Sequence, residues 1–235
     1  MSQQPTQASD YGAAAATQAT DRPESRGSGV LTGMDFAIGT CIALVMATVF
    51  TSVGSGKSLL VTFIPGLAFA WLVFAWLYWR QLELPSTDNF VPAYFATLSI
   101  QFLHFAEEFA NNFRTHFPML YGGEPYTNTL FVIFNMIAYA AFTLACLLVF
   151  YGRLRFLMLP VLFFIVYGAL GNAISHTWWQ IYATGYFPGF YTALAYWLAG
   201  PWLLNKVTGD RRITAAVVVA FGLVLVSLLS GFAAR

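Results

Sequence analysis

Seven long apolar segments, separated by short polar stretches, occupy the chain from residue 35 onward. The hydrocarbon core of a bilayer is about 30 Å thick, and a helix needs about 20 mostly apolar residues to cross it. The pattern therefore predicts an all-α fold, a polytopic transmembrane helical bundle of about seven spans. The predicted spans are Asp35–Val53, Leu59–Trp79, Phe90–Phe109, Leu130–Tyr151, Leu154–His176, Phe190–Leu204 and Ile213–Phe232. The sixth span is short and contains Pro201.

The first 29 residues differ in composition from the rest of the chain. They are rich in Ala, Gln, Thr, Ser and Gly, and such a segment buries too little apolar surface to fold. We predict a disordered tail over residues 1–29, ahead of an uncleaved first span. Residues 30–235 then form a single transmembrane helical domain.

Lys and Arg are unevenly distributed between the two sets of loops, and cytoplasmic loops carry the excess of these residues in membrane proteins. The bias predicts a cytoplasmic N-terminus (N-in) for an odd number of spans. The side that is then cytoplasmic holds Arg22, Arg26, Arg80, Arg153, Arg155, Lys206, Arg211 and Arg212, whereas the other side holds Lys57, Arg114 and Arg235. In this topology the third and fifth spans end, and the fourth begins, near the outer face.

The composition supports a membrane protein surrounded by membrane lipid. The chain is 58% hydrophobic and 9% charged, whereas soluble domains average about 25% charged residues. A net charge of +1 gives no electrostatic footprint for nucleic acid, which we exclude as a partner. Cys41 and Cys146 lie inside apolar runs, so we interpret them as small membrane-buried side chains without a disulfide role.

A cluster of ionisable residues interrupts the third apolar segment, where residues 104–108 read His-Phe-Ala-Glu-Glu. A charged side chain at the centre of a bilayer costs roughly 2.5–3.5 kcal/mol on insertion scales, and such residues usually pair or mark a functional site. Residues three and four apart share one face of a helix. The cluster therefore belongs to a polar stripe that comprises Thr97, Gln101, His104, Glu107, Glu108 and Asn111.

The fourth and fifth spans carry further polar residues at matching depth. A His and a carboxylate three or four residues apart can bind one metal ion from a single helix turn, as in zinc helices and di-iron bundles. We predict a divalent cofactor, Zn²⁺ or non-haem Fe²⁺, with His104, Glu108 and His176 as ligands. Glu107 and Glu108 are the predicted catalytic carboxylates, and the one that does not bind metal would act as general base. The predicted supporting polar residues are Gln101, Asn111, Asn135 and Asn172.

The motif His104-x-x-Glu107-Glu108, near the end of an early span, resembles the signature of the HxxEE-motif membrane proteins, a prokaryotic family of undetermined function. The motif Asn172-x-x-x-His176 and the segment Gly185–Gly189 are similar to the downstream pattern of that family. The resemblance covers about residues 90–205. It implies a multi-pass protein of the prokaryotic plasma membrane that is suspected to be a metal-dependent enzyme, and it supplies no substrate.

Three functions remain open from the sequence. The first is a metal-dependent membrane enzyme, either hydrolase- or transferase-like or an oxidoreductase, that acts on a lipid-soluble small molecule. The second is a proton-coupled transporter with His104, Glu107 and Glu108 as the relay, against which stand the missing inverted repeat and the position near one face. The third is a non-catalytic membrane scaffold, in which protonated carboxyls or an ion pair with Arg114 stabilise helix packing.

Other segments have ordinary structural interpretations. Residues 54–58 mimic the end of a phosphate-binding loop but lack the first glycine and the preceding strand, so we interpret them as a loop between two spans. His116 is interpreted as a solvated loop histidine. The aromatic segment Tyr186–Tyr191 is either an interfacial belt or a turn that re-enters the membrane and walls an apolar pocket.

Overall fold

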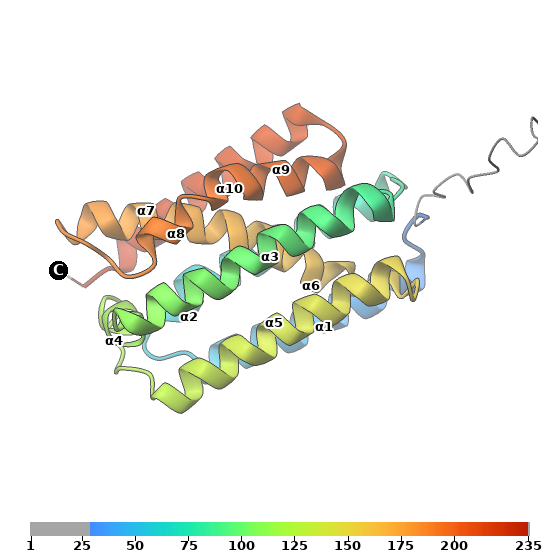
Figure 1. The fold of residues 1–235 in the computed structure, drawn as a ribbon. Helices are drawn as coiled ribbons and strands as arrows, with labels where there is room; N and C mark the ends of the chain where they lie inside the picture. The colour runs from blue at the N-terminus through green and yellow to red at the C-terminus, as the bar shows by residue number, and fades with distance from the viewer. Residues whose placement is uncertain (1–28, 235) are drawn as a thin grey trace, which may run out of the picture.

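The protein is a bundle of long helices that lie roughly along one direction (Figure 1). The computed structural model describes residues 29–234, so the predicted tail, Gly29 apart, lies outside the described residues. These residues contain helices and no strand, which confirms the all-α class for this part of the chain. The helices are α1 (Gly33–Val53), α2 (Ser58–Trp79), α3 (Thr87–Ala110), α4 (Phe113–Met119), α5 (Asn128–Phe150), η1 (Arg155–Leu157), α6 (Met158–Phe163), η2 (Phe164–Gly171), α7 (Asn172–Tyr182), α8 (Phe190–Ala193), α9 (Tyr196–Thr208) and α10 (Arg211–Phe232).

Within residues 29–234, five helical segments are long and apolar enough to cross a membrane, which indicates an integral membrane protein by length and composition. They are α1, α2, α5, the continuous stretch Arg155–Tyr182 and α10. The third predicted span, α3, has 24 residues but is less apolar because it carries the polar stripe. The sixth is divided, since a turn at residues 194–195 separates the four-residue α8 from the 13-residue α9.

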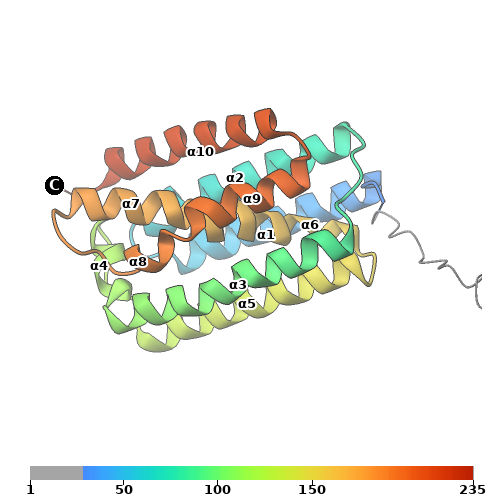
Figure 2. The ribbon, with the colours of Figure 1, turned by 45° about the horizontal axis from the view of Figure 1, so that its top comes forward.

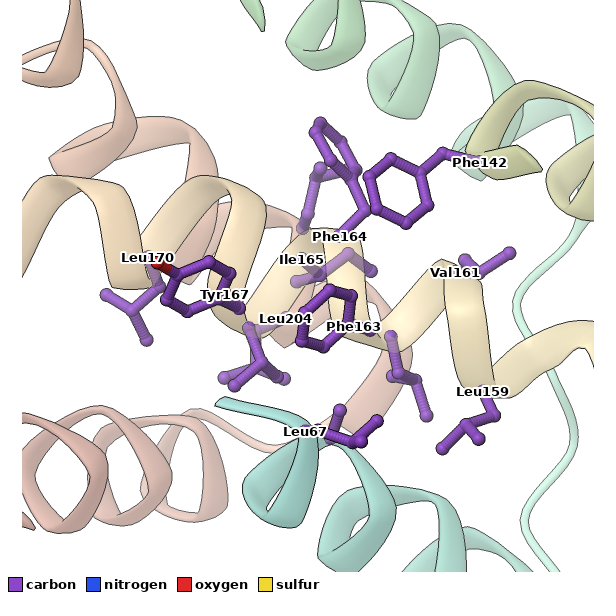
Figure 3. Close-up of a cluster of buried hydrophobic side chains, with 14 of the residues drawn as sticks. Leu67, Phe142, Leu159, Val161, Phe163, Phe164, Ile165, Tyr167, Leu170 and Leu204 are labelled. Atoms are coloured by element: carbon purple, nitrogen blue, oxygen red, sulfur yellow. The ribbon is translucent and has the colours of Figure 1, made fainter. Parts of the chain in front are cut away.

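The stretch formed by η1, α6, η2 and α7 is the centre of the bundle. Its most apolar window is 83% buried, compared with 17% for α1, 28% for α5 and 22% for α10. A helix that is apolar on all sides belongs in a core. Figure 3 shows its side chains pointing to several sides, toward Phe142 of α5, Leu67 of α2 and Leu204 of α9. The outer helices α1, α5 and α10 therefore present most of their surface to lipid.

One end of the bundle gathers the loops and short helices around the C-terminal end of α3, where α4, α7 and α8 lie in both views (Figures 1 and 2). At this end of the bundle, the loop between α1 and α2, residues 54–57, is hydrogen-bonded to the segment after α4. The backbone N–H of Lys57 donates to the Tyr121 carbonyl at 3.0 Å, and the Ser55 hydroxyl donates to the Glu124 carbonyl at 2.7 Å. The prediction that residues 54–58 form an interhelical connection is confirmed.

Glycines allow the central stretch to approach its neighbours closely, as small residues do in membrane bundles. A Cβ built on Gly66 of α2 would lie 2.7 Å from the Cβ of Tyr167, and one on Gly200 of α9 would lie 3.1 Å from the backbone N of Leu170. Neither Tyr167 nor Leu170 can move aside without shifting the central helix.

The substitution Gly66→Ala is expected to destabilise the protein by about 1–3 kcal/mol, because the added methyl group overpacks the contact with Tyr167. Gly222→Ala in α10 is the matched control, since its Cβ would meet only the Cδ1 atom of Ile174 at 3.8 Å. This control should be neutral or stabilising by up to about 1 kcal/mol, the helix propensity that alanine gains over glycine. Thermal unfolding of both variants in detergent measures the difference, and equal midpoints would contradict the packing.

Candidate metal centre

Three ionisable side chains from two helices meet inside the bundle. His104 and Glu108 lie one turn apart on α3, and His176 reaches them from α7. The Nε2 atoms of His104 and His176 lie 3.4 and 3.3 Å from the same oxygen, Glu108 Oε1. The exposed fractions are 0% for both histidines and 5% for Glu108. The structure therefore brings together the three predicted metal ligands.

The facing ring nitrogens have no hydrogen-bond partner. His104 Nε2 and both ring nitrogens of His176 are buried and unpaired. Buried polar side-chain atoms are hydrogen-bonded in the large majority of cases, so the two Nε2 atoms that face one carboxylate without a hydrogen bond need an explanation. Ligands bound at about 2.0–2.1 Å in a tetrahedral zinc site lie ~3.3–3.4 Å from one another. The separations of both histidines from Glu108 match that spacing, and the three candidate ligand atoms all lie within 4.8 Å of one another.

The second nitrogen of His104 is held by Thr192 of α8. His104 Nδ1 lies 2.8 Å from Thr192 Oγ1, and that hydroxyl donates its hydrogen to Glu107 Oε2. Because the hydroxyl hydrogen is committed to Glu107, we assign the imidazole hydrogen to Nδ1, as the donor to Thr192. The Nε2 lone pair then faces Glu108 and His176. Metal-bound histidines are oriented in this way by an acceptor on their other nitrogen.

The Glu107 carboxylate faces α8 and the turn before it. It accepts hydrogen bonds from the backbone N–H groups of Tyr191 and Thr192, at 3.1 and 2.8 Å, and from the Tyr186 hydroxyl at 2.8 Å. Free N–H groups at the start of a helix favour a carboxylate partner. Burial and the hydrogen bond to Glu107 raise the pKa of the Tyr186 phenol, which keeps this donor protonated. Glu107 thus ties α8 to α3.

A second hydrogen-bond chain runs beside Glu108. Tyr196 donates to Gln101 Oε1 at 2.7 Å, Gln101 Nε2 donates to the Tyr139 hydroxyl at 3.2 Å, and Tyr139 donates to Asn135 Oδ1 at 3.2 Å. The chain links α9, α3 and α5 through buried or half-buried groups. Two of the predicted supporting residues, Gln101 and Asn135, belong to it.

The other two supporting residues lie in different surroundings. Asn172 donates to the Gly168 carbonyl at 2.9 Å and lines the same cavity as Glu108. Asn111 is exposed at the end of α3 and donates to the Glu107 carbonyl at 2.8 Å, so it lies outside the cluster. His116 is exposed on α4 and also lies apart from the cluster, which agrees with its interpretation as a solvated histidine.

The turn before α8 packs directly on His176. A Cβ on Gly189, whose φ is +89°, would lie 2.4 Å from His176 Cε1 and 3.0 Å from Glu108 Cγ. Phe187 in the same turn is buried against Trp179, with ring centroids 5.2 Å apart. The turn therefore covers the site at His176 and Glu108.

The helical stretch that carries His176 contains a π-helical segment just before α7. Residues 164–171 form the π-helix η2, and α7 begins at Asn172. Short π-helical segments occur often at functional sites because they change the direction in which the following side chains point. Here the segment precedes the turn of α7 that presents Asn172 and His176 on the side of Glu108.

A cavity of about 780 Å³ borders Glu108. Gln101, Asn135, Tyr139 and Asn172 contribute polar atoms to its wall, and the remaining wall is mostly apolar. Its volume falls within the range of about 300–1,000 Å³ that is typical of ligand pockets. The candidate metal centre thus borders a space large enough for a small molecule.

Comparison with known proteins found no relative of this chain. No protein-family model, curated protein or solved structure matches the chain. The resemblance to HxxEE-motif proteins therefore stays a prediction based on the motif residues.

Thr192 and Tyr196 are the site residues that the sequence did not identify. Both lie in the segment predicted as a plain apolar span, and a hydroxyl on such a segment is common. Their four-residue spacing is the one available signal, since it places both on the face of α8 and α9 that meets α3.

Gly189→Ala is expected to displace His176 and to lower the free energy of unfolding by about 2 kcal/mol or more, since a left-handed conformation alone costs an alanine about 1–2 kcal/mol. Gly185→Ala in the same turn is the control, because its nearest neighbour is the Ala183 carbonyl oxygen at 3.9 Å. Thermal unfolding in detergent compares the two variants. Equal stability would show that the turn does not press on His176.

Proposed function

We propose that this chain is a metal-dependent membrane enzyme whose divalent ion, Zn²⁺ or Fe²⁺, is held by His104, Glu108 and His176. The observation that carries the proposal is the convergence of two buried histidine nitrogens without hydrogen-bond partners on one carboxylate oxygen. Two histidines and a carboxylate are a common ligand set for catalytic zinc and for non-haem iron.

The arrangement supports hydrolase- or transferase-like chemistry. His104, Glu108 and His176 would hold the ion, which would lower the pKa of a bound water and polarise a substrate carbonyl. Glu108 serves as a ligand in this proposal. Glu107 serves as a positioning residue in place of the general base, because its carboxylate already accepts hydrogen bonds from Tyr186, Tyr191 and Thr192.

The proposed topology has seven crossings with the N-terminus inside, in a prokaryotic plasma membrane. In it α3 is the third crossing, and α8 with α9 is the sixth. Among the described residues, six of the eight Lys and Arg lie toward the end of the bundle away from the metal centre, and they are Arg80, Arg153, Arg155, Lys206, Arg211 and Arg212. The positive-inside rule then supports a metal centre near the outer face.

Purified wild-type protein is expected to bind one Zn²⁺ or Co²⁺ ion per chain, and Glu108→Gln and His176→Ala should each abolish stoichiometric binding by removing a ligand. His116→Ala is the matched control, because this histidine is exposed and lies outside the cluster. Metal analysis after equilibrium dialysis in detergent measures the stoichiometry without chelating purification steps.

A wild-type protein that stays metal-free under these conditions would overturn the metal centre. Glu108 and the two histidines would then form a metal-free contact, as in a proton relay or a helix-packing contact. Circular dichroism of each variant checks that its helices are retained, since an unfolded variant would lose the metal without any specific effect on the ligands.

Thr192→Val is expected to weaken metal binding by about 10–100-fold, the usual effect of removing a group that orients a metal-bound histidine. Valine has nearly the shape of threonine but cannot accept from His104 Nδ1 or donate to Glu107. Thr192→Ser keeps the hydroxyl and should restore affinity. Competition with a metallochromic dye gives the dissociation constants, and equal affinities for the valine and serine variants would contradict the positioning role.

A further inference from the structure

The cavity beside Glu108 is a long space between helices. Its wall is formed by one face of α1, by α5, by the start of α2, by residues of α3 and α4 and by the central stretch from Leu157 to Trp179. Along α5 the lining runs from Leu130 to Leu148, which is about 27 Å at 1.5 Å per residue. That length is close to the thickness of the hydrocarbon core of a bilayer, about 30 Å.

The polar atoms of the cavity gather in one part of it. Gln101, Asn135, Tyr139 and Asn172 line the part near Glu108, whereas the part toward Leu148 and Pro160 is lined by hydrocarbon side chains. Glu108 is the single charged residue of the lining, and no Lys, Arg or His contributes to the wall that the described residues form. Such a wall offers hydrogen bonds to a neutral group, and its side chains supply no cation for a phosphate.

The cavity opens sideways between α1 and α5. Its lining includes Val45 of α1, which is 63% exposed, and Ile133 and Ile137 of α5, which are 51% and 64% exposed. Aliphatic residues at the rim and in the wall make a continuous apolar path from the outer surface of the two helices to Glu108. Since both helices present most of their surface to lipid, the mouth faces the acyl chains of the bilayer.

We propose that this cavity binds a long-chain lipid with a neutral hydrogen-bonding group, an ester or an amide, which enters from the bilayer between α1 and α5. The alkyl chain occupies the apolar part, and the neutral group lies beside Gln101, Asn135 and Glu108. The identification of this lipid as a substrate rests on the proposed metal-dependent function, whereas the binding itself does not. The membrane is thus both the surroundings of the protein and the source of its ligand.

The test uses the full chain in phosphatidylcholine vesicles and a long-chain primary amide that carries a photoreactive diazirine in its alkyl chain. Light should attach this probe to cavity residues of α1 and α5, and mass spectrometry of peptides locates the attachment. Ala138→Trp fills the cavity from α5 and should reduce labelling severalfold. Ala140→Trp is the matched control, because Ala140 is exposed on the same helix and does not line the cavity.

Two outcomes would overturn the inference. Equal labelling of both tryptophan variants would show that the probe sits on the lipid-facing surface. Equal competition by a long-chain phosphate and by the unlabelled amide would show a site that any bilayer lipid fills. Metal analysis of the same samples separates the two proposals, since a protein that binds metal without labelling contradicts the lipid site alone, and labelling without metal contradicts the metal centre alone.

Discussion

The meeting of His104 and His176 at Glu108 is the interaction around which this end of the bundle is organised. A carboxylate in an apolar interior is unfavourable unless partners compensate its charge. His176 and Glu108 come from helices far apart in the sequence, so their contact requires α3 and α7 to be held in register. The turn at Gly189, which packs on both His176 and Glu108, and the hydrogen bonds from α8 to Glu107 join these elements.

The start of α8 lies beside this centre. A helix that begins at Phe190 leaves the N–H groups of its first turn without intrahelical acceptors, and those of Tyr191 and Thr192 belong to that turn. Glu107 accepts both of them, and the Thr192 hydroxyl then orients His104. The adjacent glutamates of the motif therefore have separate tasks, one toward α8 and one toward the histidines.

The cavity gives the centre its chemical context. Glu108 lies where a mostly apolar space ends against a few amide and phenol groups, so a ligand that reaches it must be largely hydrocarbon. Buried networks such as the chain from Tyr196 to Asn135 hold their members in fixed orientations when every hydrogen bond is made. The wall near Glu108 is thus preorganised. The opposite end and the rim are formed by side chains that can adapt their conformations to a ligand.

Local patterns in the sequence were enough to predict the all-helical membrane class and the grouping of His104, Glu108 and His176. Apolar length and helical periodicity are properties of single segments, and they place His104 and Glu108 on one face of α3 whatever surrounds it. The same periodicity put Asn111 on the stripe, although that residue lies at the exposed end of the helix. Only the tertiary structure decided that Glu107 faces Thr192, that α8 and α9 are separate helices and that a cavity borders Glu108. Each of these depends on how distant segments pack against one another, which the periodicity within one helix does not determine.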